Sequence, residues 1–118
     1  MPRVLLVDDD ADQLEIRRLL LERAGHQVWA ASGVEEARRL SEENRLELVV
    51  MDLHLPEAGD GVRLIRHVRE ALPGVRIVVL SGWTEALVGT PEARMVDHVL
   101  RKPVRSGELL RLVAQGGA

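Results

Sequence analysis

Several residue types that define common protein classes are missing from this chain of 118 residues. Cysteine is absent, which excludes disulfides and thiolate metal sites and is compatible with a reducing cytosol. No apolar run approaches the ~18 residues of a membrane span, and a strand-like pattern begins too soon after Met1 for a signal peptide. We therefore expect a cytoplasmic protein with no membrane partner.

An excess of positive charge is lacking as well. The formal net charge of -3 argues against binding to a nucleic acid backbone, which normally needs clustered Lys and Arg. The chain is otherwise typical of a globular protein, with 46% hydrophobic and 30% charged residues. At this length we expect one domain, residues 1–118, with a single core.

Strand-like and helix-like segments alternate along the chain. Short apolar runs predict five strands, over residues 3–7, 28–30, 46–51, 75–80 and 98–101. Helical spacing of apolar residues predicts helices over about 12–24, 32–43 and 61–72, and from residue 106 onward. This order is typical of an α/β fold with a doubly wound, five-stranded parallel sheet of the (βα)5, flavodoxin-like type.

Three local signals refine these boundaries. Ser32 and Glu35 have the spacing of a capping box at the start of the second helix. Residues 54–60 contain proline and glycine and are predicted to form a loop. The segment 84–96 is interrupted by glycine and proline, so we expect an atypical short fourth helix with Thr90 as its N-cap.

Polar residues follow four of the predicted strands, at the point where each strand ends. The acidic run 8–10 follows the first strand, Asp52 the third, Ser81 the fourth and Lys102 the fifth. Parallel strands deliver their carboxyl ends to a common edge, where open α/β sheets bind ligands. We therefore expect these side chains to converge on one pocket.

Clustered carboxylates need a compensating positive charge. Asp8, Asp9 and Asp52 suit Mg²⁺, which prefers carboxylate oxygens and keeps several water ligands. Ser81 adds a hydroxyl donor, and Lys102, the only lysine among 16 basic residues, adds a compact ammonium. Phosphoryl transfer to a carboxylate requires a bound metal ion, an ammonium group and a hydrogen-bond donor in this arrangement.

Each assignment has a simpler structural alternative. The acids after the first strand alternatively cap the helix that follows, a role expected of Asp10 or Asp12. Which two of the three acids bind metal stays open, the first two being favoured by their place at the strand end. Asp52 is alternatively a loop acid, and Ser81 a solvent-facing turn residue. The four histidines show no metal-ligand spacing and are predicted to be structural or exposed.

The ordered motifs resemble the receiver domain of two-component response regulators, of the chemotaxis-regulator kind, over essentially the whole chain. The likeness is carried by residues 4–10, 49–56 with 60–61 downstream, 78–82 and 102–103. It implies a signalling domain phosphorylated by a histidine kinase or phosphotransfer protein, with Mg²⁺ as cofactor. No enzyme activity is implied beyond, at most, intrinsic autodephosphorylation.

The resemblance also implies a role for each residue of the predicted pocket. Asp52 would be the phosphorylated residue, and Asp8 and Asp9 would hold Mg²⁺ together with it. Ser81 would turn toward the phosphoryl group, and Lys102 would pair with it.

Three more residues receive an expectation from the same resemblance. The peptide bond before Pro103 is expected to be cis. His54 and Trp83 stand two residues beyond the phosphoacceptor and the hydroxyl donor, at positions that in the family modulate how fast the acyl phosphate hydrolyses.

The chain departs from the family pattern on the side that is expected to signal. The family usually carries an aromatic residue three before the lysine, where this chain has Val99, and neither Phe nor Tyr occurs anywhere. The usual Gly-Ala pair before the last strand is missing, and the loop between Pro56 and Gly61 is one residue longer than usual. We expect intact phosphoryl chemistry and an altered output surface, which signals through a different face or through Trp83 and residues 84–91.

Two other functions fit parts of the sequence. A receiver-like interaction domain that works without phosphorylation would keep the fold but would not need the acids and Lys102. A phosphatase of the haloacid dehalogenase type uses a strand-end Asp with Mg²⁺, but it wants a second Asp two residues on, where this chain has His54. No glycine-rich phosphate loop follows the first strand, which argues against a nucleotide-binding module.

Overall fold

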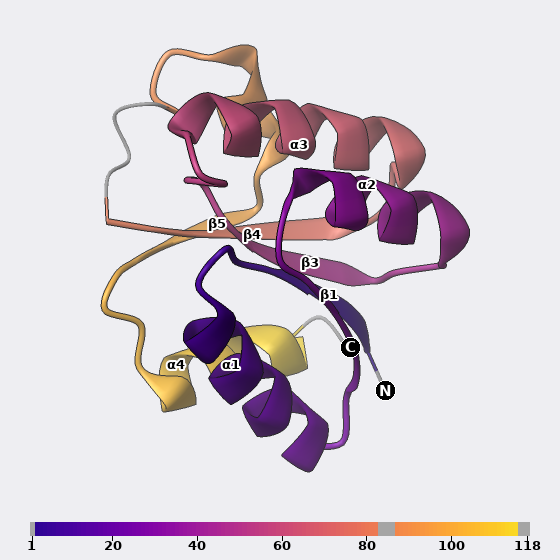
Figure 1. Cartoon of the computed structure of the whole chain (residues 1–118), viewed down its shortest axis with the longest axis vertical. Helices are drawn as coiled ribbons and strands as arrows, with labels where there is room; N and C mark the ends of the chain where they lie inside the picture. Colours follow the sequence, from indigo (N-terminus) through magenta and orange to yellow (C-terminus); the bar gives the residue numbers. More distant parts are fainter. Residues whose placement is uncertain (1, 83–86, 116–118) are drawn as a thin grey trace.

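The computed structural model describes residues 2–82 and 87–115, in which strands and helices alternate (Figure 1). The elements are, in chain order, β1 (Arg3–Val7), α1 (Ala11–Arg23), β2 (Gln27–Ala31), α2 (Val34–Glu43), β3 (Leu48–Asp52), α3 (Ala58–Ala71), β4 (Arg76–Ser81), the 3₁₀-helix η1 (Pro91–Met95), β5 (His98–Arg101) and α4 (Ser106–Gln115). All five strands are parallel, in the order β2-β1-β3-β4-β5. Helices α1 and α4 cover one face of the sheet, and α2 and α3 cover the other (Figure 1). The predicted doubly wound sheet is confirmed.

The central strands β1, β3 and β4 are buried on both faces, which explains why their sequences are continuous apolar runs. Leu5 and Val49 belong to the hydrophobic cluster under α2 and α3. Their neighbours Leu6 and Val50 belong to the cluster under α1 and α4. Burying each such side chain stabilises the fold by roughly 1.5–3 kcal/mol. The sheet is therefore a rigid support for the residues at its strand ends.

The direction of winding reverses between β1 and β3. From β1 the chain passes outward to β2, whereas from β3 it passes to β4 and β5 on the opposite side. Val7 of β1 is in register with Met51 of β3, so these two strands end side by side. Ligands of open α/β sheets bind outside the carboxyl ends of the strands at such a reversal.

Helix α1 begins where the sequence predicts a cap. The carboxylate of Asp10 accepts hydrogen bonds from the backbone N–H groups of Asp12 at 3.0 Å and Gln13 at 3.2 Å. This satisfies two of the donors that every helix start leaves without a partner. Among the described helices, none is long and apolar enough to cross a lipid bilayer.

The capping box predicted from Ser32 and Glu35 is wrong. Gly33 is the N-cap of α2, and it provides no side-chain cap. The backbone N–H of Ser32 instead donates to Glu36, one residue beyond the predicted partner, at 2.9 Å. The spacing was right for a cap, but the helix begins later than the signal indicates.

Helix α3 begins three residues earlier than predicted. Residues 58–60, assigned to a loop because of their glycine and proline neighbours, form its first turn. The carboxylate of Asp60 accepts a hydrogen bond from the N–H of the N-cap residue Glu57 at 3.1 Å, which stabilises this early start.

The helix between β4 and β5 is short, as expected: η1 has 5 residues. Thr90 is the N-cap of η1 and Pro91 its first residue, but the Thr90 hydroxyl donates to the carbonyl of Leu87 at 2.6 Å and does not cap the helix. Glu92, which is 8% exposed, accepts a hydrogen bond from Arg66 Nε of α3 at 2.7 Å. This ion pair fixes η1 to α3.

Strand β5 is mostly exposed to solvent. Val99 of β5 is in register with Val79, which is fully buried under α2 and α3. Val99 itself is 42% exposed. The position at which the family usually carries an aromatic residue is thus a surface aliphatic here.

The ion pair of Glu92 predicts a pH-dependent stability. A hydrogen bond from its own backbone N–H and one from Arg66 lower the pKa of Glu92 from its usual value of 4.5. A carboxyl group whose pKa is lower in the folded state stabilises the fold above its unfolded pKa and loses this contribution as the pH falls through the folded pKa. Glu92→Gln should therefore lower the melting temperature by a few degrees at pH 7, and the difference should shrink below pH 4.5.

Circular dichroism melts of both proteins between pH 3 and pH 7 would measure this difference. The matched control is Glu70→Gln, which removes the same charge from an exposed position of α3. Equal melting temperatures for wild type and Glu92→Gln at pH 7 would contradict the stabilising role of the pair.

Candidate functional site

The carboxylates predicted to converge do so at the reversal between β1 and β3. Asp8 directly follows β1, and Asp52 is the last residue of β3. One carboxylate oxygen each of Asp8, Asp9 and Asp52 lies within 4.8 Å of the others. Asp8 and Asp52 are 2% and 7% exposed, whereas Asp9 is exposed to solvent. Three such oxygens beside water suit a divalent cation that keeps several water ligands.

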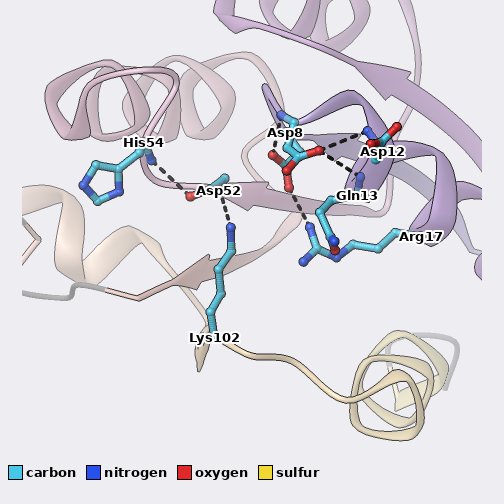
Figure 2. Close-up of polar contacts among 8 residues, drawn as sticks. Asp8, Asp12, Gln13, Arg17, Asp52, His54 and Lys102 are labelled. Atoms are coloured by element: carbon cyan, nitrogen blue, oxygen red, sulfur yellow. Dashed lines mark hydrogen bonds and ion pairs between the residues drawn. The ribbon is translucent and has the colours of Figure 1, made fainter.

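The carboxylate of Asp10 is not part of the acidic cluster, which Asp8 and Asp9 form together with Asp52. Its carboxylate caps α1, as described above, while its own N–H donates to Asp8 Oδ1 at 2.9 Å. The other oxygen of Asp8 accepts from Arg17 Nη1 at 2.6 Å (Figure 2). Both oxygens of the buried Asp8 are therefore hydrogen-bonded, which offsets the cost of burying its charge.

The carboxylate of Asp52 is held by two donors from different parts of the chain. Lys102 Nζ lies 2.5 Å from Asp52 Oδ2, and the backbone N–H of His54 lies 3.2 Å from Oδ1 (Figure 2). The imidazole ring of His54 extends away from the carboxylate (Figure 2). Asp52 is a buried strand residue, so the alternative of a loop acid is wrong.

Lys102 reaches Asp52 from the end of β5, two strands away from β3. Its backbone N–H donates to the carbonyl of Ser81 at 3.1 Å, and the peptide bond to Pro103 is cis, as expected. A second cis bond joins Leu55 and Pro56 in the loop after β3.

Ser81 is the last residue of β4 and is fully buried. The register of β3 and β4 pairs Asp52 with Leu80, so that Ser81 stands one step beyond Asp52 at the same edge. The alternative of a solvent-facing turn residue is therefore wrong. Trp83, the second expected rate modulator, lies outside the described residues.

Gly61 fixes the backbone that follows Asp52. A Cβ added to Gly61 would overlap the carbonyl group of Leu53, the residue directly after Asp52. Leu53 is itself fully buried. Only glycine allows the first turn of α3 to pack this closely on the backbone of Leu53, which directly follows Asp52.

Arg17 is the residue of this site that the sequence reasoning missed. Its position three residues after Leu14 and four before Leu21 places it on the sheet-facing side of α1. A basic residue on the apolar side of a helix is the signal that could have revealed it, because a buried guanidinium needs a carboxylate partner.

Comparison with known proteins agrees with this geometry. The family model described as response regulator receiver domain matches residues 4–114. Transcriptional regulatory protein PrrA of Mycobacterium bovis is 39% identical over 95% of this chain and 48% of its own length. Sensor histidine kinase AruS of Pseudomonas aeruginosa is 34% identical over 97% of this chain, but over only 12% of its own length.

A solved structure supports the same likeness. The response regulator protein from Burkholderia pseudomallei, described with a phosphorylated aspartic acid, calcium ion and citrate, superposes with a TM-score of 0.84 at 28% identity. The match covers 96% of this chain and 66% of that one. The chain belongs to the response regulator receiver domain family of two-component systems. It spans half or less of the length of the two curated relatives named above, and its acidic cluster supports binding of a divalent metal ion.

The close contact between Gly61 and Leu53 predicts that adding one methyl group to Gly61 strongly destabilises the fold. Gly61→Ala should lower the free energy of unfolding by about 3 kcal/mol, the upper range for overpacking, because backbone has to move. Urea denaturation followed by circular dichroism would measure it.

Gly59→Ala in the same turn is the matched control. Its added Cβ would meet only the end of the Arg63 side chain, at an ordinary 3.5 Å, so its stability should equal or exceed that of the wild type. A Gly61→Ala protein as stable as Gly59→Ala would show that the close approach is not required.

Proposed function

We propose that this chain is a single receiver domain, residues 1–118, that is switched by phosphorylation of Asp52. The observation that supports this most directly is the pairing of Asp52 with Lys102 at 2.5 Å beside a cluster of carboxylates. The phosphoryl donor is a histidine kinase or phosphotransfer protein of the cytoplasm. A carboxylate oxygen of Asp52 forms the new bond to phosphorus as the phosphorus–nitrogen bond of the donor breaks.

Asp8, Asp9 and Asp52 would hold Mg²⁺ through their carboxylate oxygens. When bound, Mg²⁺ supplies neutralising charge to the oxygens of the transferred phosphoryl group. Lys102 would exchange its contact with Asp52 for a phosphoryl oxygen, and the Ser81 hydroxyl would donate to another. Both changes occur at the ends of β4 and β5, and β5 is one of the two edge strands of the sheet.

The site works as an acceptor and not as a turnover enzyme, apart from slow autodephosphorylation. A phosphatase would place a second acid two residues after the nucleophile, whereas His54 stands there with its ring directed away from Asp52 (Figure 2). The downstream partner is an effector domain or protein, and direct contact with nucleic acid is not expected from the net charge of -3.

Labelling with a small phosphoryl donor tests the acceptor assignment. Incubation with acetyl phosphate and Mg²⁺ should add the mass of one phosphoryl group to the wild type, and EDTA should abolish the addition. Asp52→Asn should show no added mass, because an amide cannot form the acyl phosphate. Intact mass spectrometry reads out all three samples. An unlabelled wild type, or an Asp52→Asn protein labelled to the same extent, would overturn the proposal.

His54 is proposed to modulate how long the acyl phosphate survives, as is Trp83. The backbone N–H of His54 contacts Asp52 whatever the side chain, so His54→Ala should still be phosphorylated. Loss of the imidazole changes the surface beside the phosphorylated residue and should change the lifetime several-fold, as followed by mass spectrometry after removal of acetyl phosphate. His98→Ala, at an exposed position at the start of β5, is the control. Equal lifetimes for all three proteins would refute this role.

A further inference from the structure

Arg17 occupies a position of α1 where an apolar side chain would be expected. Leu14 and Leu21, on the same side of the helix, both pack into the cluster under α1 and α4. The side chain of Arg17 is only 13% exposed, whereas that of the next residue, Arg18, is 32% exposed. A guanidinium in such surroundings has to be paired.

The partner of Arg17 is a member of the acidic cluster. Arg17 Nη1 lies 2.6 Å from Asp8 Oδ2, and the Asp8 side chain is only 3% exposed. Figure 2 shows the Arg17 side chain reaching from α1 toward this carboxylate. The two residues lie beside apolar side chains such as Val50 and Leu80, and the gap between them is too small to hold a water molecule. Charges in such weakly polar surroundings interact more strongly than charges in water.

We infer that Arg17 is an internal counter-cation of Asp8 that competes with the divalent metal ion for the acidic cluster. This inference rests on the proposed function, because it concerns the metal ion that Asp8, Asp9 and Asp52 would hold. The guanidinium is already hydrogen-bonded to one oxygen of Asp8. Its positive charge therefore lies next to a carboxylate that would hold the metal ion. Binding of the metal ion therefore requires Arg17 either to share that carboxylate or to withdraw from it.

A count of charges shows why this matters. Asp8, Asp9 and Asp52 carry three negative charges, and Lys102 and Arg17 return two positive ones. A divalent cation makes this group net positive by one charge, which is unfavourable in a half-buried site. Replacement of the Asp52 charge by a phosphoryl group adds about one negative charge and restores neutrality. Arg17 thus weakens metal binding before phosphorylation.

The test compares the Mg²⁺ affinity of two variants that lose the same charge. Full-length wild type, Arg17→Leu and Arg18→Leu are titrated with MgCl₂ at constant ionic strength, and amide shifts in ¹H–¹⁵N NMR spectra give each Kd. Arg17→Leu should bind Mg²⁺ about tenfold more tightly than wild type, a coupling typical of interacting sites. Arg18→Leu, whose guanidinium pairs with glutamates on the helix surface, should match the wild type.

The same spectra report whether each variant is folded. Arg17→Gln, which keeps a polar side chain without the charge, is titrated in parallel and should shift the affinity in the same direction as Arg17→Leu. A merely structural Arg17 would leave the Kd unchanged or raise it when replaced, and either result in both variants would overturn the inference. A tighter Kd in Arg18→Leu equal to that in Arg17→Leu would also overturn it, because the effect would then be one of net charge.

Failure of the proposed function has a different signature. If neither the wild type nor the Arg17 variants bind Mg²⁺, the metal site itself is refuted, and the inference falls with it. If all bind with the same Kd and acetyl phosphate still labels Asp52, the proposed function stands and the role of Arg17 alone is refuted.

Discussion

Mutual repulsion among three carboxylates is the constraint on which this site depends. Asp8, Asp9 and Asp52 bring their oxygens within 4.8 Å of one another, two of them almost fully buried. Like charges at this distance stay ionised only where cations and hydrogen-bond donors compensate them. Lys102 and Arg17 supply that compensation from the end of β5 and from the inner side of α1. The rigid sheet holds these elements so that repulsion does not separate the acids.

Parallel topology explains why so much of the site was predictable from the sequence. In a parallel sheet, the carboxyl ends of all strands lie at the same edge. The order of residues along the chain is therefore enough to assign Asp52, Ser81 and Lys102 to that edge. The three central strands were equally predictable, because strands buried on both faces are continuous apolar runs. Both signals are local, and a fold of this kind converts them directly into geometry.

Other features depend on contacts between distant segments and could not be predicted in that way. The helical pattern with a basic residue inside it indicates that Arg17 needs a carboxylate partner, but it does not reveal that this partner is Asp8. Pro56 and the glycines that follow it indicated a loop, whereas Gly59 and Gly61 lie in the first turn of α3 and Gly61 is a glycine because Leu53 packs against it. The predicted N-cap Ser32 is one residue away from the observed N-cap Gly33. Capping signals in a sequence locate a helix start less exactly than the packing that fixes it.

The hydrogen bond between the backbone of Lys102 and that of Ser81 has a consequence for how the domain responds. The N–H of Lys102 donates to the carbonyl of Ser81 at 3.1 Å, so the two residues stand on one joined piece of backbone. A movement of either side chain that shifts its backbone is transmitted to the other. The ammonium of Lys102 and the hydroxyl of Ser81 are therefore carried by two strand ends that are hydrogen-bonded to each other. The outer of these strands, β5, carries the exposed Val99. A displacement of either backbone that keeps this hydrogen bond would therefore move both strand ends, including that of the edge strand β5.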